Sequence, residues 1–320
     1  MQPPTLKDVY DARPRVYRLV RPTPLLPHPL LCRHTGLDIR VKHENHNPTG
    51  AFKVRGGLNL IASLSEHDRR GVITATTGNH GQSIAIACRQ ERVPCTIVTP
   101  VGNNPEKNAA MRALGADVIE FGRDFDEARE RVEELQHERR LRYVHSANEP
   151  LLIAGVATYA LEIFADWPEA DVILVPIGGG SGACGCCIVR SALGSRARVI
   201  GVQAERADAF ARSWRGRERV VRDSADTLAE GMATRVTFDL PFGILEAELD
   251  DIVTLTEDEL AHGVCLALET THNLAEGAGA APLAAALKLR DQLAGKRVVC
   301  VMSGGNIDRA TLKRVIGAET

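Results

Sequence analysis

A lysine at the start of an expected helix is the first candidate for chemistry in this chain. Lys53 lies in the segment His43 to Gly57, directly after Phe52 and a Pro-Thr-Gly turn. Burial of its amine, or a second cation beside it such as Arg55, would lower its pKa and leave a neutral nucleophile that can form a Schiff base. The alternative is a surface lysine on a first helical turn, and this segment alone does not exclude it.

A second segment, Thr74 to Ser83, follows an apolar run and opens a helix with small and hydroxyl residues. It carries Thr76, Thr77, Asn79 and His80 within one turn. Free backbone N–H groups at such a helix start suit an anion such as a carboxylate. An ordinary capped turn is the alternative.

A third segment contains three consecutive glycines, Gly178, Gly179 and Gly180, followed by Ser181 and Gly182. Glycine amides before a helix can cradle a phosphate, because no side chain blocks the approach and the helix dipole favours negative charge. No P-loop lysine follows, and the dinucleotide pattern is met only in its looser form with alanine last. The loop therefore favours a monophosphate over a dinucleotide.

A fourth segment, Val301 to Asp308, is an apolar run that ends in Ser303 and two glycines. A hydroxyl at the end of a buried strand can donate to, or accept from, the nitrogen of a heterocycle. Taken alone, this pattern is weak evidence.

The elements that must position these segments follow an alternating pattern. Short runs of β-forming residues predict strands that begin at Val72, Cys95, Ala116, Asp171, Arg198, Asp251 and Arg297. Amphipathic stretches predict helices over Gly56 to Ser65, His80 to Gln90, Asp124 to Arg140, Leu151 to Trp167, Glu257 to Thr271 and Gly279 to Leu293. This order indicates an α/β fold with largely parallel sheets.

Two separately wound sheets are expected, because three of the strands cluster before residue 121 and the other four lie beyond residue 170. We predict a larger cofactor-binding domain from residues 1–48 and 148–320, and a smaller domain from residues 49–147. The proline-rich segment Leu25 to Leu31 is expected to lie across the surface of one lobe rather than to form a regular helix. Ligands bind beyond the carboxyl ends of strands in open α/β sheets, where all four segments fall.

Composition excludes several classes of protein. The net charge of −2 over 320 residues argues against nucleic-acid binding, and no apolar run is long enough to span a membrane. The first residues have no apolar core typical of a secretory signal, so we expect a cytoplasmic protein. The eight cysteines are then expected to be free. For Cys184, Cys186 and Cys187, close helix packing is favoured over redox or metal chemistry.

Together, in this order and spacing, the four segments resemble the fold-type II pyridoxal-phosphate enzymes, whose fold is that of the tryptophan synthase β chain. Within them the likeness is to the threonine/serine dehydratase and serine racemase group, and it covers nearly the full chain. The resemblance implies two doubly wound parallel-sheet lobes with the active site between them, a small amino-acid substrate and homo-oligomeric assembly. It implies no metal site, because Gln203, with Glu205 two residues on, stands where relatives carry a cation-binding glutamate.

The resemblance also assigns roles to individual residues. Lys53 would carry pyridoxal 5'-phosphate as a Schiff base, with Phe52 against the ring. The ring hydroxyl would contact Asn79 and the ring nitrogen would face Ser303. The phosphate would bind Gly178, Gly179, Gly180, Ser181 and Gly182, and the substrate would bind Thr76, Thr77, Gly78, Asn79, His80 and His46.

The implied reaction is elimination of water from a 3-hydroxy amino acid such as threonine or serine, with Lys53 as the base. A neutral hydroxyl at the ring nitrogen favours elimination over transamination. Alternatives within the group are phenylserine, hydroxyaspartate and hydroxyectoine-derived substrates, and serine racemisation, although Thr77 stands where racemases carry a serine. From other classes, a nucleotide-binding dehydrogenase, with Glu205 as its acidic residue, and a cofactor-storing protein remain open.

Overall fold

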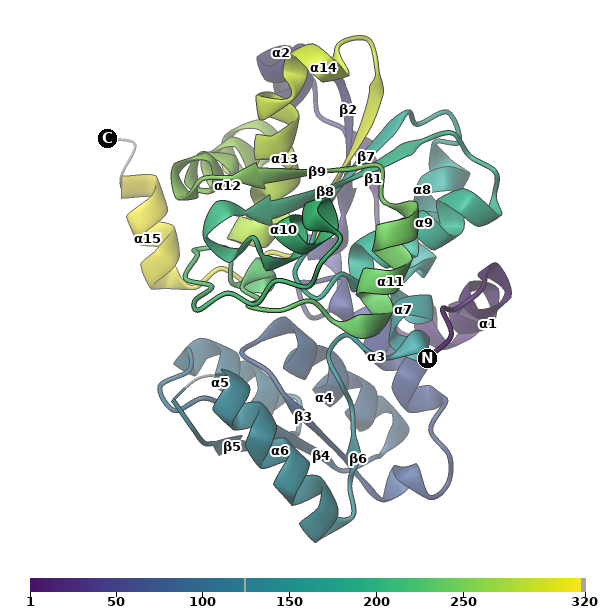
Figure 1. Ribbon diagram of the computed structural model, residues 1–320, viewed down its shortest axis with the longest axis vertical. Coiled ribbons are helices and arrows are strands. Elements are labelled where there is room, and N and C mark those ends of the chain that lie inside the picture. The colour runs from purple at the N-terminus through teal and green to yellow at the C-terminus, as the bar shows by residue number, and fades with distance from the viewer. Residues whose placement is uncertain (124, 318–320) are drawn as a thin grey trace.

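The computed structural model describes residues 1–123 and 125–317, which fold into two lobes (Figure 1). Each lobe is built on its own sheet, a six-stranded sheet in the larger lobe and a four-stranded sheet in the smaller one. Every strand of the larger sheet lies within residues 1–48 or 148–320, and every strand of the smaller sheet lies within residues 49–147. The boundaries themselves stay a prediction, and residues 318–320 of the larger domain lie outside the described part of the chain.

The sheet of the larger lobe has the order β1-β2-β10-β7-β8-β9. Only β1 runs antiparallel to its neighbour, and the other pairs are parallel. Its strands are β1 (Leu25–Pro27), β2 (Asp38–His43), β7 (Val172–Pro176), β8 (Arg198–Ala204), β9 (Asp251–Leu255) and β10 (Arg297–Met302). Because the strands are parallel, their carboxyl ends lie along one edge of the sheet.

Both faces of this sheet are buried, which explains its nearly continuous apolar strands. On β7, Val172 and Leu174 enter one apolar cluster, whereas Ile173 and Val175 enter the other. Alternation of side chains along a strand produces this division. The first face is covered by α2 (Pro29–Thr35), α12 (Glu257–Thr271) and α13 (Gly277–Lys288), and the second by α7 (Pro150–Val156), α8 (Thr158–Asp166), α9 (Ser181–Ala192) and α11 (Asp239–Glu248).

The smaller lobe has an all-parallel sheet of order β5-β4-β3-β6. Its strands are β3 (Val72–Ala75), β4 (Cys95–Thr99), β5 (Asp117–Glu120) and β6 (Arg142–Tyr143). Apolar residues of α6 (Phe125–Arg139) pack on one face, and α3 (Lys53–Ala62) and α4 (Asn79–Glu91) pack on the other. The helix α5 (Pro105–Ala113) joins β4 to β5.

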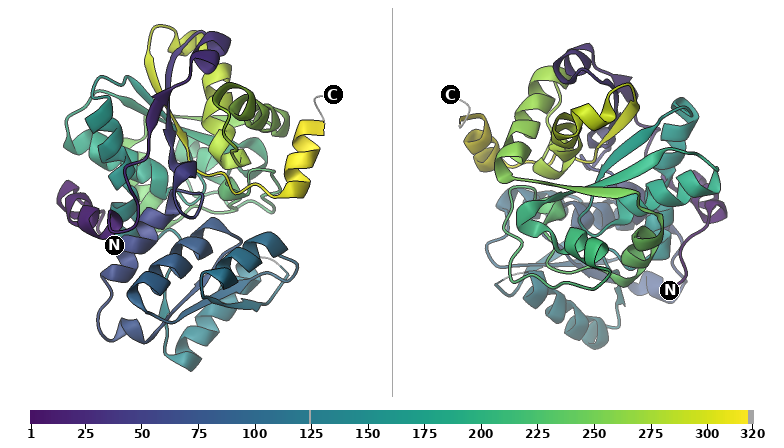
Figure 2. Two further views of the ribbon diagram at one scale, coloured as in Figure 1. Left: turned by 180° about the vertical axis from the view of Figure 1, so that it is seen from behind. Right: turned by 45° about the horizontal axis from the view of Figure 1, so that its top comes forward.

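Short helices complete the chain. They are α1 (Leu6–Val16), α10 (Ala209–Gly216), α14 (Arg290–Leu293) and α15 (Arg309–Gly317), with the 3-10 turns η1 (Glu44–His46), η2 (Asp68–Arg70), η3 (Glu205–Ala207) and η4 (Glu230–Met232). The helix α1 begins at a capping box in which Thr5 and Asp8 exchange hydrogen bonds. The rear view shows α1 against the larger lobe near the junction, while α15 lies at the opposite side of that lobe (Figure 2).

All seven predicted strands are present, but the sequence interpretation missed β1, β2 and β6. The expectation that Leu25 to Leu31 forms no regular helix was wrong for Pro29 to Leu31, whereas the exposed Leu26 and Leu30 agree with the expected place on the surface. The segment forms β1 and then the first turn of α2, in which Pro29 occupies a first-turn position that needs no backbone N–H donor. The predicted helix from Leu151 divides into α7 and α8, and the one from Gly279 into α13 and α14. Asp124, the expected start of another helix, lies outside the described residues.

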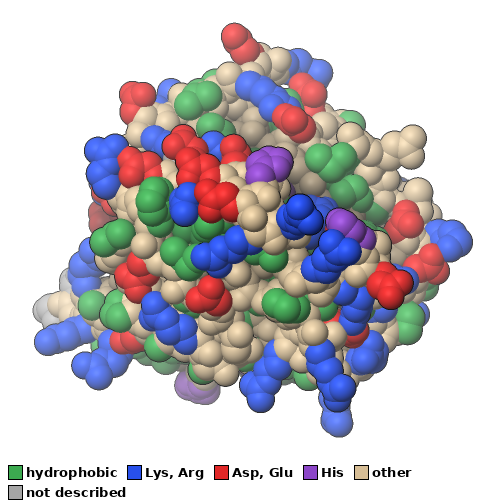
Figure 3. Space-filling view, turned by 90° about the horizontal axis from the view of Figure 1, so that it is seen from below, with side chains coloured by type: hydrophobic (Ala, Val, Ile, Leu, Met, Phe, Trp, Pro, Cys, Tyr) green, Lys and Arg blue, Asp and Glu red, His purple; other side chains and the backbone are tan. Residues whose placement is uncertain are grey.

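Among the described helices, none combines the length and apolar character that a membrane span requires. Acidic and basic side chains are interspersed over the face seen from below (Figure 3). On α6, which belongs to the smaller lobe, Arg129 pairs with Glu133 and Arg131 with Glu134. Such pairs one turn apart add little stability.

Candidate active site

A cavity of about 760 Å³ lies between the two lobes. The loops that follow β3, β7 and β10 line it, so it lies beyond the carboxyl ends of strands from both sheets. The structure brings nearly all predicted site residues into it: Phe52, Lys53, Thr76, Thr77, Gly78, Asn79, His80, Gly178, Gly179, Gly180, Ser181, Gly182 and Ser303. Four segments distant in the sequence therefore line one cavity.

Lys53 is the first residue of α3, and its amine points into this cavity. The preceding backbone is tied to the end of β10, where the N–H of Phe52 donates to the carbonyl of Ser303 over 3.0 Å. The hydrogen bond from Lys53 Nζ to Ser181 Oγ is long, at 3.5 Å, so the amine is weakly held. Burial lowers the pKa of Lys53 to about 8. The amine is therefore prepared to act as a nucleophile or a base.

The predicted influence of Arg55 on this lysine was wrong. Burial is the cause of the lowered pKa of Lys53. The guanidinium of Arg55 is fully buried and bonds instead to the carboxylates of Glu44 and Glu162, at 2.6 to 2.9 Å. Lys42 also donates to Glu162, so this cluster holds two cations and two carboxylates. It anchors α3 to η1 and α8, and so fixes the helix that begins at Lys53.

The glycine loop between β7 and α9 has the shape of a phosphate cradle. A Cβ atom on Gly178 would collide with the carbonyl oxygen of Gly231, and Gly180 has φ +89°, a conformation that favours glycine. Ser181 then begins α9 and is 1% exposed. The first N–H groups of a helix have no partner within it, so this end of α9 offers donors to an anion.

The loop after β3 has a second helix N-terminus, that of α4. The hydroxyl of Thr76 accepts from the N–H groups of Gly78 and Gly81, at 3.1 and 3.3 Å, and so holds the loop closed on itself. Thr77 follows with a less buried side chain. The loop therefore offers the Thr77 hydroxyl and the first amides of α4 to a second anion.

Two histidines of the cavity are neutral near pH 7. Burial lowers the pKa of His80 to about 3, with a further contribution from the charge of Lys53, and His80 Nε2 lies 3.1 Å from Thr74 Oγ1. Burial lowers the pKa of His145 to about 4, and its Nδ1 accepts from two backbone N–H groups. Neither imidazole therefore supplies a positive charge to a bound anion.

Two further polar side chains of the cavity, those of Ser303 and Asn79, have hydrogen-bonding capacity left for a ligand. Ser303 is 4% exposed, yet within the described chain no hydrogen bond reaches its hydroxyl. The amide of Asn79 donates through Nδ2 to Glu276 Oε1 over 2.8 Å, and its Oδ1 accepts from Asn306 Nδ2 over 2.7 Å. The serine offers a hydroxyl, and the asparagine keeps one N–H free.

Three residues considered from the sequence lie elsewhere. His46 is exposed, its ring stacks on that of His43 at 4.7 Å, and it bonds to Asn273 rather than lining the cavity. The side chain of Gln203 is fully buried and accepts from the N–H of Ala211, whereas Glu205 is exposed on η3. No group of three or more potential metal ligands was found in residues 1–123 and 125–317.

The sequence interpretation missed the charged residues that complete the cavity: Lys107, Arg129, Glu230, Arg235 and Glu276. Lys107 of α5 forms an ion pair with Glu230 of η4, which joins the two lobes across the cavity. Burial raises the pKa of Glu276 to about 7. The one sequence signal for this residue was an acid placed directly before the apolar, glycine-rich and alanine-rich run that forms α13.

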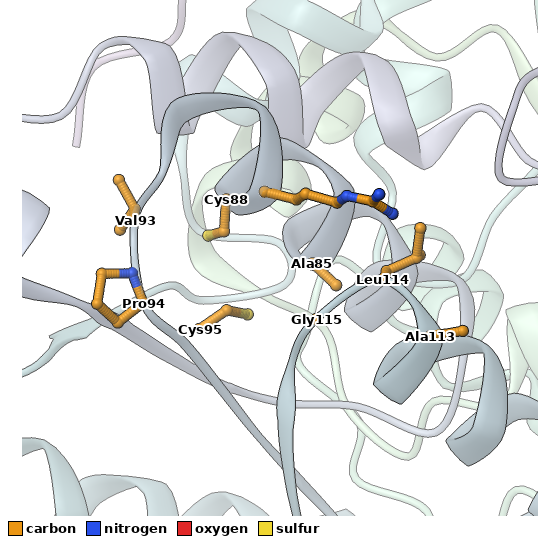
Figure 4. Close-up of a pocket in the computed structure, with 9 residues that line it drawn as sticks. Ala85, Cys88, Val93, Pro94, Cys95, Ala113, Leu114 and Gly115 are labelled. Atoms are coloured by element: carbon orange, nitrogen blue, oxygen red, sulfur yellow. The ribbon is translucent and has the colours of Figure 1, made fainter.

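A second, smaller pocket of about 250 Å³ lies on the smaller lobe, among α4, β4 and α5 (Figure 4). Cys88 and Cys95 line it, and their mutual hydrogen bond and burial raise the pKa of Cys88 far above its ordinary value. In α9, Cys184 is fully buried and its thiol donates to a backbone carbonyl. These thiols are packing groups and weak nucleophiles.

The fold and the site together define an enzyme class. A desolvated lysine lies in one cavity with a glycine loop before a helix, a second helix N-terminus and a buried serine hydroxyl. An enzyme that acts on amino acids with a phosphorylated carbonyl cofactor needs groups of these kinds. Residues 16–304 match the family described as pyridoxal-phosphate dependent enzymes. The chain belongs to this family, and pyridoxal phosphate is its cofactor.

Named relatives extend over almost the whole chain. It is 40% identical to an L-threonine ammonia-lyase of Thermotoga maritima, over 98% of this chain and 78% of that protein. It is 33% identical to an L-threo-3-hydroxyaspartate ammonia-lyase of Saccharomyces cerevisiae, over 95% of this chain and 94% of that protein. Among solved structures, the processed form of threonine deaminase isoform 2 from Solanum lycopersicum superposes with a TM-score of 0.93 at 27% identity, covering 99% and 90% of the two chains.

Proposed function

We propose that this enzyme eliminates water from a 3-hydroxy amino acid such as threonine or serine. The observation that carries the proposal is the position of Lys53, whose desolvated amine lies in one cavity with the Thr76 loop and the glycine loop. The names of the similar ammonia-lyases support the reaction class. Water lost in the elimination is regained when the released enamine hydrolyses, so the net products are a 2-oxo acid and ammonia.

The residues of the chain suit the holding of pyridoxal phosphate. Gly178 to Gly182 and the N-terminus of α9 would bind its phosphate, Ser303 would meet its ring nitrogen and Phe52 would lie against its ring. When bound, the cofactor supplies an electron sink that makes the α-proton of an amino acid acidic. A hydroxyl opposite the ring nitrogen, in place of a carboxylate, moderates this sink and favours elimination over transamination.

The remaining residues of the cavity would act on the substrate. The amides that follow Thr76, with the hydroxyl of Thr77, would bind the substrate carboxylate at the N-terminus of α4. The neutral amine of Lys53 would then take the α-proton onto Nζ. The ion pair of Lys107 with Glu230, which joins the two lobes at the cavity, would help to exclude water during the reaction.

A second candidate substrate is 3-hydroxyaspartate. The observation that favours it is the set of cations Lys107, Arg129 and Arg235 along the cavity, which could hold a second carboxylate. One of the similar proteins bears that substrate in its name. His46, which lies outside the cavity, is no longer part of the proposed substrate site. The dehydrogenase alternative is dropped, because the chain belongs to the pyridoxal-phosphate family.

The test is a panel of 3-hydroxy amino acids in both stereochemical series, assayed for 2-oxo acid and ammonia. The purified protein should show a visible absorption band that borohydride removes, and Lys53→Ala should lack both the reducible band and the activity. Lys313→Ala, an exposed lysine on α15, is the matched control and should keep both. A reducible band in Lys53→Ala would refute the central assignment, and interconversion of enantiomers without 2-oxo acid would replace elimination with racemisation.

Arg129→Leu separates the two substrate candidates. If the cavity is adapted to 3-hydroxyaspartate, kcat/KM for that substrate should fall by about tenfold or more, the loss expected for one charge-assisted hydrogen bond, whereas kcat/KM for threonine should be nearly unchanged. An equal change for both substrates would remove the reason for preferring a dicarboxylic substrate. Cytoplasmic location and homo-oligomeric assembly remain predictions from the sequence.

A further inference from the structure

A buried carboxyl group that the proposed reaction does not use lies in the cavity. Glu276 directly precedes α13, and its backbone N–H donates to the carbonyl of Gly304 over 3.1 Å. Its Oε1 is so close to Gly304 that a Cβ atom there would lie 2.6 Å from it. Because Gly304 follows Ser303, the carboxyl group of Glu276 lies beside the serine predicted to meet the ring nitrogen.

Glu276 is the last acceptor in a series of hydrogen bonds from Asn306 through Asn79, and the bonds of Asn306 determine which group donates at each step. Asn306 uses both hydrogens of its Nδ2, one to the carbonyl of Thr49 and one to Oδ1 of Asn79. The amide of Asn79 must therefore accept through Oδ1 and donate through Nδ2. One of its two Nδ2 hydrogens goes to Glu276 Oε1 over 2.8 Å. The other remains for a ligand in the cavity.

These hydrogen bonds prevent a rotation of the Asn79 side-chain amide that would change the chemistry of the site. A flip of the Asn79 amide would place its nitrogen against the nitrogen of Asn306, which is repulsive at any pH, and its oxygen against the oxygen of Glu276, which is repulsive when Glu276 is ionised. The cavity consequently presents an N–H donor at this point, and not an acceptor. An N–H donor favours the ionised form of a phenolic oxygen over its protonated form.

The protonation of Glu276 is sensitive to pH in the neutral range. Burial raises its pKa to about 7, the repulsion of Glu230 adds to this, and Lys107 and the hydrogen bond from Asn79 oppose it. Above this pH the carboxylate carries a charge, which strengthens the hydrogen bond from Asn79. Below it, a protonated carboxyl group accepts more weakly.

We infer that Glu276 is a positioning residue that holds Asn79 with an N–H directed at the phenolic oxygen of the cofactor ring, and that the charge of Glu276 controls the ionisation of that oxygen. The inference rests on the proposed function because it takes pyridoxal phosphate to bind in this cavity, with its ring hydroxyl at Asn79 as the family resemblance implies. It assigns a role to a residue outside the four segments that the sequence singled out.

The experiment compares the visible absorption spectrum of the cofactor-loaded wild type with those of Glu276→Gln and Glu276→Leu across the neutral pH range. The wild-type band should change with a midpoint at about pH 7. Glu276→Gln keeps an acceptor for Asn79 but cannot titrate, so its spectrum should lose the pH-dependent change. Glu276→Leu removes one of the two hydrogen bonds that orient the Asn79 amide and leaves only the one from Asn306. Its band should therefore shift toward the protonated ring form, and kcat should fall about tenfold with little change in KM.

Glu230→Gln is the matched control, because Glu230 is the other carboxylate that lines the cavity and it does not contact Asn79. Its limiting spectra at low and high pH should match those of the wild type. Spectra of both Glu276 variants that follow the wild type at every pH would overturn the inference. A protein that shows no reducible band with pyridoxal phosphate would instead overturn the proposed function, so the two failures are distinguishable.

Discussion

The lowered pKa of Lys53 makes a quantitative prediction for the capture of pyridoxal phosphate. Between the ordinary lysine value of 10.5 and a pKa of about 8, the fraction of neutral amine at pH 7 differs by roughly 300-fold. Only the neutral amine attacks a carbonyl, so the fraction that can react rises with pH and reaches one half at about pH 8. An exposed lysine would continue to gain reactive amine up to a pH of about 10.5.

The assay mixes cofactor-free protein with excess pyridoxal phosphate at a series of pH values and follows the growth of the visible band. The rate constant should rise about tenfold per pH unit below pH 8 and level off above it. His80 and His145 are neutral throughout this range, so they do not contribute. Glu276 is the other group of the cavity that titrates nearby, and repeating the series with Glu276→Gln removes its contribution.

A second perturbation tests whether burial is the cause of the lowered pKa of Lys53. The ring of Phe52 has its centroid 5.4 Å from Lys53 Nζ, so Phe52→Ala should admit water to the amine and move the midpoint upward. A rate that continues to rise beyond pH 10 in the wild type would refute the reasoning, because the amine would then be no more desolvated than an exposed lysine. A midpoint unchanged in Phe52→Ala would show that this ring does not shield the amine.

Three further predictions follow from the packing. Gly178→Ala places a methyl group against a backbone carbonyl and should abolish retention of the cofactor in a gel-filtration assay, whereas Gly243→Ala, which meets open space, should retain it. Arg55→Met leaves two buried carboxylates without their guanidinium and should lower the free energy of unfolding by about 3 to 5 kcal/mol in urea titrations; a loss below about 1 kcal/mol would contradict the role of this cluster. A thiol reagent should modify Cys32 in the native protein and the other seven cysteines only after denaturation; rapid native labelling of α9 would show that its thiols are accessible.

The sequence by itself determined the local chemistry of the site. Three consecutive glycines before a helix, and a hydroxyl-rich turn before another, predict anion sites because the properties that matter are backbone freedom and free N–H groups, which neighbouring residues set. The seven central strands were also predictable, because strands buried on both faces are continuous apolar runs. The strand β2 was not predicted, because charged residues alternate with its apolar ones and make its composition similar to that of a loop.

Only the tertiary structure decided which charges meet. Arg55 is two residues from Lys53 in sequence, yet it is directed into the cluster with Glu44 and Glu162, and burial rather than a neighbouring cation lowers the pKa of the lysine. His46 is close to Lys53 in sequence and yet lies outside the cavity, whereas Glu276 is more than 200 residues away and lines it. The physical reason is that desolvation and ion pairing depend on distance in space, which the packing of the two lobes sets and the spacing along the chain does not.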